Sequence, residues 1–124
     1  MKLEQYQIIH SNKLIAEFMG LETATFIPSG HLNYYHREFD SGTWYEVHEL
    51  SYNLSWDWLM PVVEKIECTT IDGLDNSDNF FNVMIEVFEC NINGGDICIC
   101  KGGNTKFKAT YNAVLEFIIN KYKN

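Results

Sequence analysis

The chain has 124 residues, enough for one domain that buries most of its unfolded surface, and we expect residues 1–124 to form that single domain. Hydrophobic residues make up 46% of the chain and aromatic residues 15%, which excludes intrinsic disorder because disordered chains are poor in apolar groups. The net charge of −8 argues against direct binding of nucleic acid, since carboxylates repel phosphates. No apolar leader and no apolar run of the ~20 residues that cross a bilayer is found, so the sequence predicts a soluble protein that is not exported.

The first predicted helix covers "NKLIAEFMG", residues 12–20, which carries an apolar face and ends at Gly20. Ser11 or Asn12 is suited to cap this helix. Alternatively, the helix extends further toward the N-terminus through residues 6–11.

A loop with at most one short strand is expected over residues 20–43, because "PSGH" and "FDSG" are turn-forming and no period is sustained. The following "GTWYEVHEL", residues 42–50, alternates in polarity and predicts a strand. His36 and His48 could meet at a metal ion in space, but surface histidines are the simpler interpretation. We therefore expect no bound metal.

The segment "LSWDWLMPVVEKIE", residues 54–67, predicts a helix with one apolar stripe. Ser55 is a candidate cap, which places Pro61 inside the helix; alternatively the helix begins just before Pro61, where proline is well tolerated. In a helix Trp56 and Trp58 lie about 200° apart, so one of them faces away from the core. Either both tryptophans pack as a hydrophobic plug under a loop, or the outward one is exposed and contacts a partner protein.

Charge is distributed unevenly along the second half of the chain. Between Lys65 and Lys101 there are seven carboxylates and no lysine or arginine, whereas from Lys101 onward five lysines accompany only Glu116. The simpler interpretation is that these carboxylates keep the protein soluble; the functional one is an acidic surface that binds a basic partner. The candidate partner-binding residues are Asp72, Asp75, Asp78, Glu86, Glu89, Asp96, Trp56 and Trp58.

The apolar run "FFNVMIEVFECNI", residues 80–92, predicts one long strand that is covered on both faces. "NGGD" at residues 93–96 then turns the chain, and "ICIC" at residues 97–100 forms the second arm of a hairpin. With the turn centred on the two glycines, Ile92 pairs with Ile97.

No known catalytic pattern is present, so we predict a protein that is not an enzyme and has no cofactor. The absence of C-x-x-C pairs and of a secretion signal favours free, packed thiols over a disulfide framework or a zinc site. These thiols belong to Cys68, Cys90, Cys98 and Cys100.

The last predicted helix covers residues 104–122, with Asn104 or Thr105 as its cap and a stripe of large apolar residues. Two glycines and several lysines precede it, a combination that can bind a small anion at a helix N-terminus. A plain glycine loop is the simpler interpretation, because no Walker pattern is present. The candidate anion-binding residues are Lys101, Gly102, Gly103, Asn104, Thr105 and Lys106.

Together these elements predict an α+β fold with three helices and a small, mostly antiparallel sheet. Three segments, "NKLIAEFMG" (12–20), "SWDWLMPVVEKIE" (55–67) and "ATYNAVLEFI" (109–118), resemble small uncharacterised proteins of phages and prophages, especially of Bacteroidota. Those proteins are similar to the phage α-β-α sandwich domain. The resemblance covers 32 of the 124 residues and implies a sandwich-like fold and a mobile-element origin, but no activity.

The predicted function is that of a phage or prophage accessory protein in the cytoplasm of a bacterial host. We expect it to inhibit host defence by binding a protein complex through its acidic surface, for example a CRISPR-associated nuclease with a basic surface for nucleic acid. One alternative is a small module that sequesters a nucleotide or another anion at residues 101–108. Another is a phage housekeeping protein with a different partner.

Overall fold

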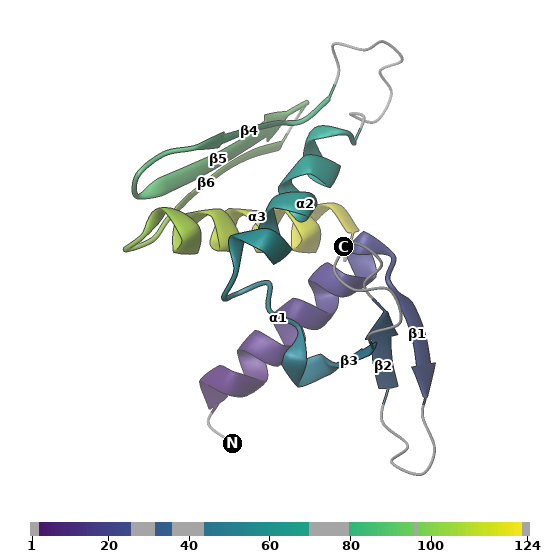
Figure 1. Ribbon diagram of the computed structural model, residues 1–124. Coiled ribbons are helices and arrows are strands. Elements are labelled where there is room, and N and C mark those ends of the chain that lie inside the picture. The colour runs from purple at the N-terminus through teal and green to yellow at the C-terminus, as the bar shows by residue number, and fades with distance from the viewer. Residues whose placement is uncertain (1–2, 26–31, 36–43, 70–79, 96, 123–124) are drawn as a thin grey trace. The chain divides into compact units, whose positions relative to one another are not determined.

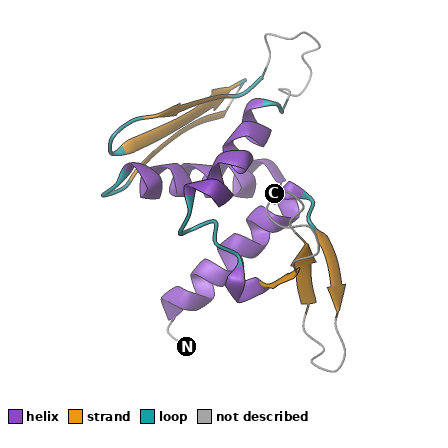
Figure 2. Cartoon of the chain, in the orientation of Figure 1, coloured by secondary structure: helices purple, strands orange, loops and turns teal. Residues whose placement is uncertain are grey.

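The computed structural model describes residues 3–25, 32–35, 44–69, 80–95 and 97–122 (Figure 1). Three helices and two antiparallel three-stranded sheets account for most of these residues, which confirms the predicted α+β class (Figure 2). The strands form two sheets where the sequence predicted one. Contacts within the chain define two compact units, Met1–Tyr52 and Asn53–Asn124. The expectation of a single domain stays a prediction.

The first unit begins with α1 (Leu3–Met19), which starts well before the suggested cap residues, so the extended alternative is correct. Asn12 therefore lies inside the helix. Gly20 ends the helix as predicted, with a φ of 70° that residues with a side chain rarely adopt. The N–H of Leu21 then donates to the carbonyl of Ala16 at 3.2 Å, which closes a Schellman motif.

The sheet of the first unit corrects the prediction of a loop between residues 20 and 43. It consists of β1 (Glu22–Thr25), β2 (Leu32–Tyr35) and β3 (Trp44–Glu46), paired antiparallel in that order. These strands are three or four residues long, too short to produce a recognisable alternation in the sequence. Of the described part of the predicted strand at residues 42–50, only β3 is a strand, because the chain continues into the 3₁₀ turn η1 (Val47–Glu49).

A buried hydrogen bond joins α1 to the end of this unit. The side-chain amide of Asn12 donates to the carbonyl of Leu50 at 2.9 Å, across 38 residues of sequence. Both residues are buried, so the bond satisfies polar groups that water does not reach. Asn12 thus acts as a tertiary contact and not as the helix cap suggested by the sequence.

The second unit begins with α2 (Trp56–Glu67), whose cap is Ser55. The Ser55 hydroxyl accepts a hydrogen bond from the N–H of Asp57 at 3.2 Å, so the first of the two proposed helix starts is confirmed. Pro61 lies inside the helix, where it cannot donate to the carbonyl of Asp57. The helix buries its predicted stripe, which consists of Leu59, Val62, Val63 and Ile66, and it also buries Trp58.

The apolar run at residues 80–92 forms two strands and not one. β4 (Asn82–Ile85) and β5 (Glu89–Gly94) pair antiparallel, and the chain reverses between them. β5 also pairs with β6 (Ile97–Gly102), which confirms the predicted hairpin but not its register. Ile92 pairs with Ile99 instead of Ile97, because Gly95 has a φ of 55° and takes the turn while Gly94 remains in the strand. The shift is two residues, so every side chain keeps its predicted face.

The last helix, α3 (Lys106–Tyr122), packs along one face of this second sheet (Figure 1). Ile92, Ile99 and Cys90 are buried on the covered face, and Phe117 of α3 meets Phe81 edge to face at 4.9 Å. The opposite face carries exposed side chains of β4 and β6. The prediction that this segment is covered on both faces is therefore wrong. None of the described helices is long and apolar enough to span a bilayer.

We expect Asn12→Ala to lower the free energy of unfolding by about 1–2 kcal/mol, because the carbonyl of Leu50 is left buried without its donor and only part of the loss is offset by the helix propensity of alanine. Urea unfolding followed by circular dichroism measures the difference. Lys13→Ala, at the exposed neighbouring position, is the control and should change stability by less than about 0.5 kcal/mol. Equal effects of the two substitutions would contradict the assigned role of Asn12.

Candidate functional site

Two of the predicted partner-binding carboxylates, Glu86 and Glu89, lie at the two ends of the turn between β4 and β5. We call residues 86–89 the Glu86–Glu89 turn. The predicted concentration of negative charge on one flank of the molecule stays a prediction, because most of the carboxylates concerned lie outside the described residues. Outside the described residues lie Asp72, Asp75, Asp78 and Asp96.

The Glu86–Glu89 turn has a backbone that is fixed at two points. The N–H of Glu86 donates to the carbonyl of Glu89 at 2.8 Å, and the N–H of Gly103 donates to the carbonyl of Phe88 at 3.1 Å. The side chains between them nevertheless point to solvent, since Val87 and Phe88 are each 62% exposed. The turn thus presents an aliphatic and an aromatic side chain, flanked by two carboxylates, in one defined conformation.

The charge on Glu89 is stabilised by its neighbours on the open face of the sheet. The thiol of Cys100 donates to one carboxylate oxygen at 2.9 Å, and the side-chain amide of Asn91 donates to the other at 3.4 Å. These hydrogen bonds, the thiol's first, lower the pKa of Glu89 below its ordinary value. The same hydrogen bond raises the pKa of the Cys100 thiol. Glu89 is therefore held ionised while Cys100 is held as a thiol.

The cysteines are only partly packed as predicted. Cys90 is buried on the covered face, and burial raises the pKa of its thiol. Cys68, Cys98 and Cys100 are exposed free thiols. Cys98 and Cys100 flank the buried Ile99 in β6. Both lie on the open face, because successive side chains of a strand point to opposite faces.

The two tryptophans face in different directions, as the helical geometry predicted. Trp58 is 9% exposed and belongs to the apolar core, so it is not available to a partner in this fold. Trp56 is 36% exposed and lies edge to face against Phe107 at 4.9 Å. Of the pair, only Trp56 contributes to a surface, and part of its ring already packs against α3.

The predicted anion site at the entrance of α3 is occupied by interactions of the protein itself. The ammonium group of Lys101 lies 3.5 Å from the carboxylate of Glu116. Thr105, one of the two suggested caps, accepts a hydrogen bond from the N–H of Lys108 at 3.0 Å. The carboxylate of Glu116 offsets the positive charge of Lys101, and the cap uses one of the N–H groups that could bind an anion. Both effects weaken the attraction of this entrance for an anion.

The two glycines at this entrance have different structural roles. A Cβ added at Gly103 would lie 2.6 Å from the backbone nitrogen of Ala109, so no side chain fits there. A Cβ at Gly102 would come no closer than 3.5 Å to the carbonyl oxygen of Phe88, an ordinary contact. Gly103 is thus required for close packing of β6 on the first turn of α3, which accounts for its presence without a ligand. The remaining predicted residues, Asn104 and Lys106, are exposed.

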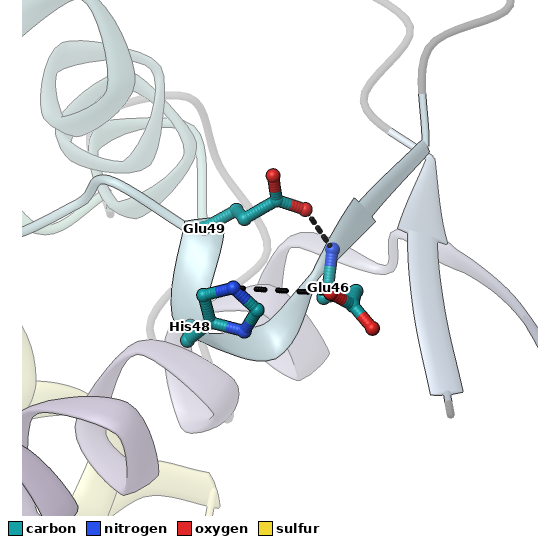
Figure 3. Close-up of polar contacts among 3 residues, drawn as sticks. All are labelled: Glu46, His48 and Glu49. Carbon is teal, nitrogen blue, oxygen red and sulfur yellow. Dashed lines mark hydrogen bonds and ion pairs between the residues drawn. The ribbon is translucent and has the colours of Figure 1, made fainter. Parts of the chain in front are cut away.

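A third group of polar side chains was not predicted as a site. Glu46, His48 and Glu49, around the turn η1, each bring one potential metal-ligand atom within 4.8 Å of the others (Figure 3). No second group of three such side chains is found in the part of the chain that the structure describes. His36, suggested as a partner of His48, lies outside the described residues.

Comparison with protein-family models, with curated proteins and with solved structures finds no match for this chain. The resemblance of three segments to phage proteins stays a prediction. The expectations that the chain is not an enzyme and has no cofactor also stay predictions.

We expect Glu89→Gln to accelerate alkylation of Cys100 by iodoacetamide, because loss of the neighbouring carboxylate increases the thiolate fraction of Cys100. Peptide mass spectrometry after timed labelling gives the rate at each cysteine. Cys98, on the same strand, serves as the internal reference and should react at an unchanged rate. An unchanged ratio of the two rates would show that the thiol–carboxylate contact does not form in solution.

Gly103→Ala is expected to lower the free energy of unfolding by about 1–3 kcal/mol, because the new methyl group overlaps the backbone of α3. Gly102→Ala is the matched control and should cost at most about 1 kcal/mol. Chemical denaturation of both variants provides the comparison. If Gly102→Ala were the more damaging substitution, the close packing at Gly103 would be refuted.

Proposed function

We propose that this protein is a non-catalytic accessory factor that binds another protein through the Glu86–Glu89 turn. The observation that supports this function is the exposure of Val87 and Phe88, 62% each, on a turn whose backbone is fixed by two hydrogen bonds. Large exposed apolar side chains mark interaction sites when they are grouped and rimmed by polar residues.

The geometry of the turn favours affinity for a partner. Aromatic side chains are enriched among the residues that dominate binding energy, and Phe88 is the most prominent candidate. Because the backbone is already ordered, binding costs less conformational entropy than it would for a flexible loop. Trp56 adds a half-exposed aromatic surface elsewhere on the same unit.

The charge of the turn indicates the kind of partner. Glu86 and Glu89 flank the apolar pair, and the contact with Cys100 and Asn91 holds Glu89 in its ionised form. Carboxylates attract basic surfaces and accelerate association with them. The partner proposed is therefore a protein with a basic surface that contains a small apolar pocket.

Basic surfaces of this kind are typical of proteins that handle nucleic acid. Together with the resemblance of three segments to phage and prophage proteins, this supports an anti-defence role in which the turn occupies a nucleic-acid groove of a host effector. A CRISPR-associated nuclease complex is the example we favour. The protein would then compete with RNA or DNA without itself binding either.

The alternative function, capture of a nucleotide or another anion at residues 101–108, receives less support. Lys101 is close to Glu116, and Gly103 is explained by packing. No observation at this entrance points to a ligand.

Binding to purified CRISPR-associated nuclease complexes, measured with and without their guide RNA at low salt, tests the proposal. The double variant Val87→Ser/Phe88→Ser should bind at least about 30-fold more weakly, the loss expected of an interface hot spot of about 2 kcal/mol. Glu86→Gln/Glu89→Gln should mainly slow association and reduce its dependence on salt.

Leu54→Ser is the matched control, since Leu54 is an apolar side chain outside the turn with an exposure of 77%. It should leave binding unchanged. Full binding by the Val87→Ser/Phe88→Ser variant would refute the role of the turn. Failure to bind any of the complexes at low salt would refute the proposed class of partner.

A further inference from the structure

The side chains around η1 form a cluster of potential metal ligands that is independent of the Glu86–Glu89 turn. Nε2 of His48 lies 3.8 Å from a carboxylate oxygen of Glu46, and Glu49 completes the group with its ligand atom within 4.8 Å (Figure 3). His48 and Glu49 are exposed and Glu46 is half-buried, so an ion from solvent can reach all three.

The spacing of these atoms is somewhat wider than a bound metal ion requires. Zinc binds histidine nitrogen and carboxylate oxygen at about 2.0–2.2 Å, which places neighbouring ligand atoms of a tetrahedral site about 3.4 Å apart. The observed 3.8 Å between His48 and Glu46 therefore needs a contraction of about 0.4 Å, whereas the ligand atom of Glu49, within 4.8 Å of the other two, needs one of up to about 1.4 Å. Rotation of the glutamate side chains on binding is the movement that would supply this contraction.

The backbone of η1 orients both carboxylates. One oxygen of Glu49 accepts a hydrogen bond from the N–H of Glu46 at 2.8 Å, and the side chain of Glu46 accepts one from the N–H of Glu49. This reciprocal capping box ties both carboxylates to the backbone of η1. Carboxylates that bind metals are commonly held in this way by hydrogen bonds to their other oxygen. The 3₁₀ turn thus supplies an outer shell for the cluster.

The cluster also has an electrostatic reason to bind a cation. Two carboxylates within 4.8 Å of each other repel, and the only neighbouring group within the cluster that can carry a positive charge is the imidazole of His48. A divalent ion would relieve this repulsion and use the neutral imidazole as a ligand.

We propose that Glu46, His48 and Glu49 bind a divalent transition-metal ion of the zinc class. One imidazole and two carboxylates suit Zn²⁺ and its neighbours in the first transition row, whereas Mg²⁺ and Ca²⁺ prefer oxygen ligands alone. Three protein ligands leave a coordination position for water. The site is shallow, so we expect binding in the micromolar range and not the tighter binding of a structural zinc site.

Zn²⁺ titration of the Cys68→Ser/Cys98→Ser/Cys100→Ser variant tests the proposal, because the three exposed thiols would otherwise compete for the ion. Calorimetry gives the dissociation constant, and NMR of the His48 ring shows whether this imidazole is the ligand. In that background, His48→Ala and Glu49→Gln should each weaken binding by about tenfold or more. Glu49→Gln retains an oxygen for the capping box, so its effect reports the lost carboxylate and not a disrupted turn.

The matched control is His10→Ala, which removes an exposed histidine of α1 and should leave the dissociation constant unchanged. Mg²⁺ in place of Zn²⁺ should not shift the His48 ring resonances. The proposal would be overturned by an unshifted His48 ring at about 1 mM Zn²⁺, a concentration far above a micromolar dissociation constant. Equal affinities of the His48→Ala variant and its parent would also overturn it.

Discussion

The burial of one face of the β4–β5–β6 sheet by α3 is the constraint on which the second unit depends. For α3 to approach the sheet closely, the chain entering the helix must carry no side chain at Gly103, and the helix must present the small residues Ala109 and Ala113. The same Gly103 donates its N–H to the carbonyl of Phe88 and so fixes the turn that leads into β5. Gly103 therefore contributes both to the packing of the core and to the conformation of the proposed binding surface.

The sequence predicts the structure correctly where a local signal and the tertiary contacts agree. The Ser55 cap and the Gly20 stop depend on hydrogen bonds within a few residues, and the stripe of α2 follows from the helical period. The predictions are wrong where the local signal is weak or misleading. Val87 and Phe88 form a turn without glycine, asparagine or proline, so the sequence pattern there is that of one continuous strand. In α3 the predicted large residues Tyr111, Val114 and Ile118 are buried, but the buried face also takes in the small Thr110 and Ala113, and Ile119 is exposed.

The candidate sites were harder to predict for a geometrical reason. In a continuous strand Glu46 and Glu49 would point to opposite faces, whereas the 3₁₀ turn brings residues three apart onto the same side. Glu86 and Glu89 likewise become neighbours only because the chain reverses between them. Their residue types were visible in the sequence. Their proximity depends on backbone conformations that composition and period do not encode.

In the Glu86–Glu89 turn, the groups that maintain the fold are separate from the side chains of the proposed binding surface. Its conformation is held by backbone hydrogen bonds. Any residue type can make such bonds, except that proline has no N–H to donate. Substitutions at positions 87 and 88 can therefore accumulate without loss of the scaffold. Under the proposed function, a changing target would favour repeated replacement of both side chains, so divergence should concentrate at positions 87 and 88 while Gly103 and the α3 interface persist.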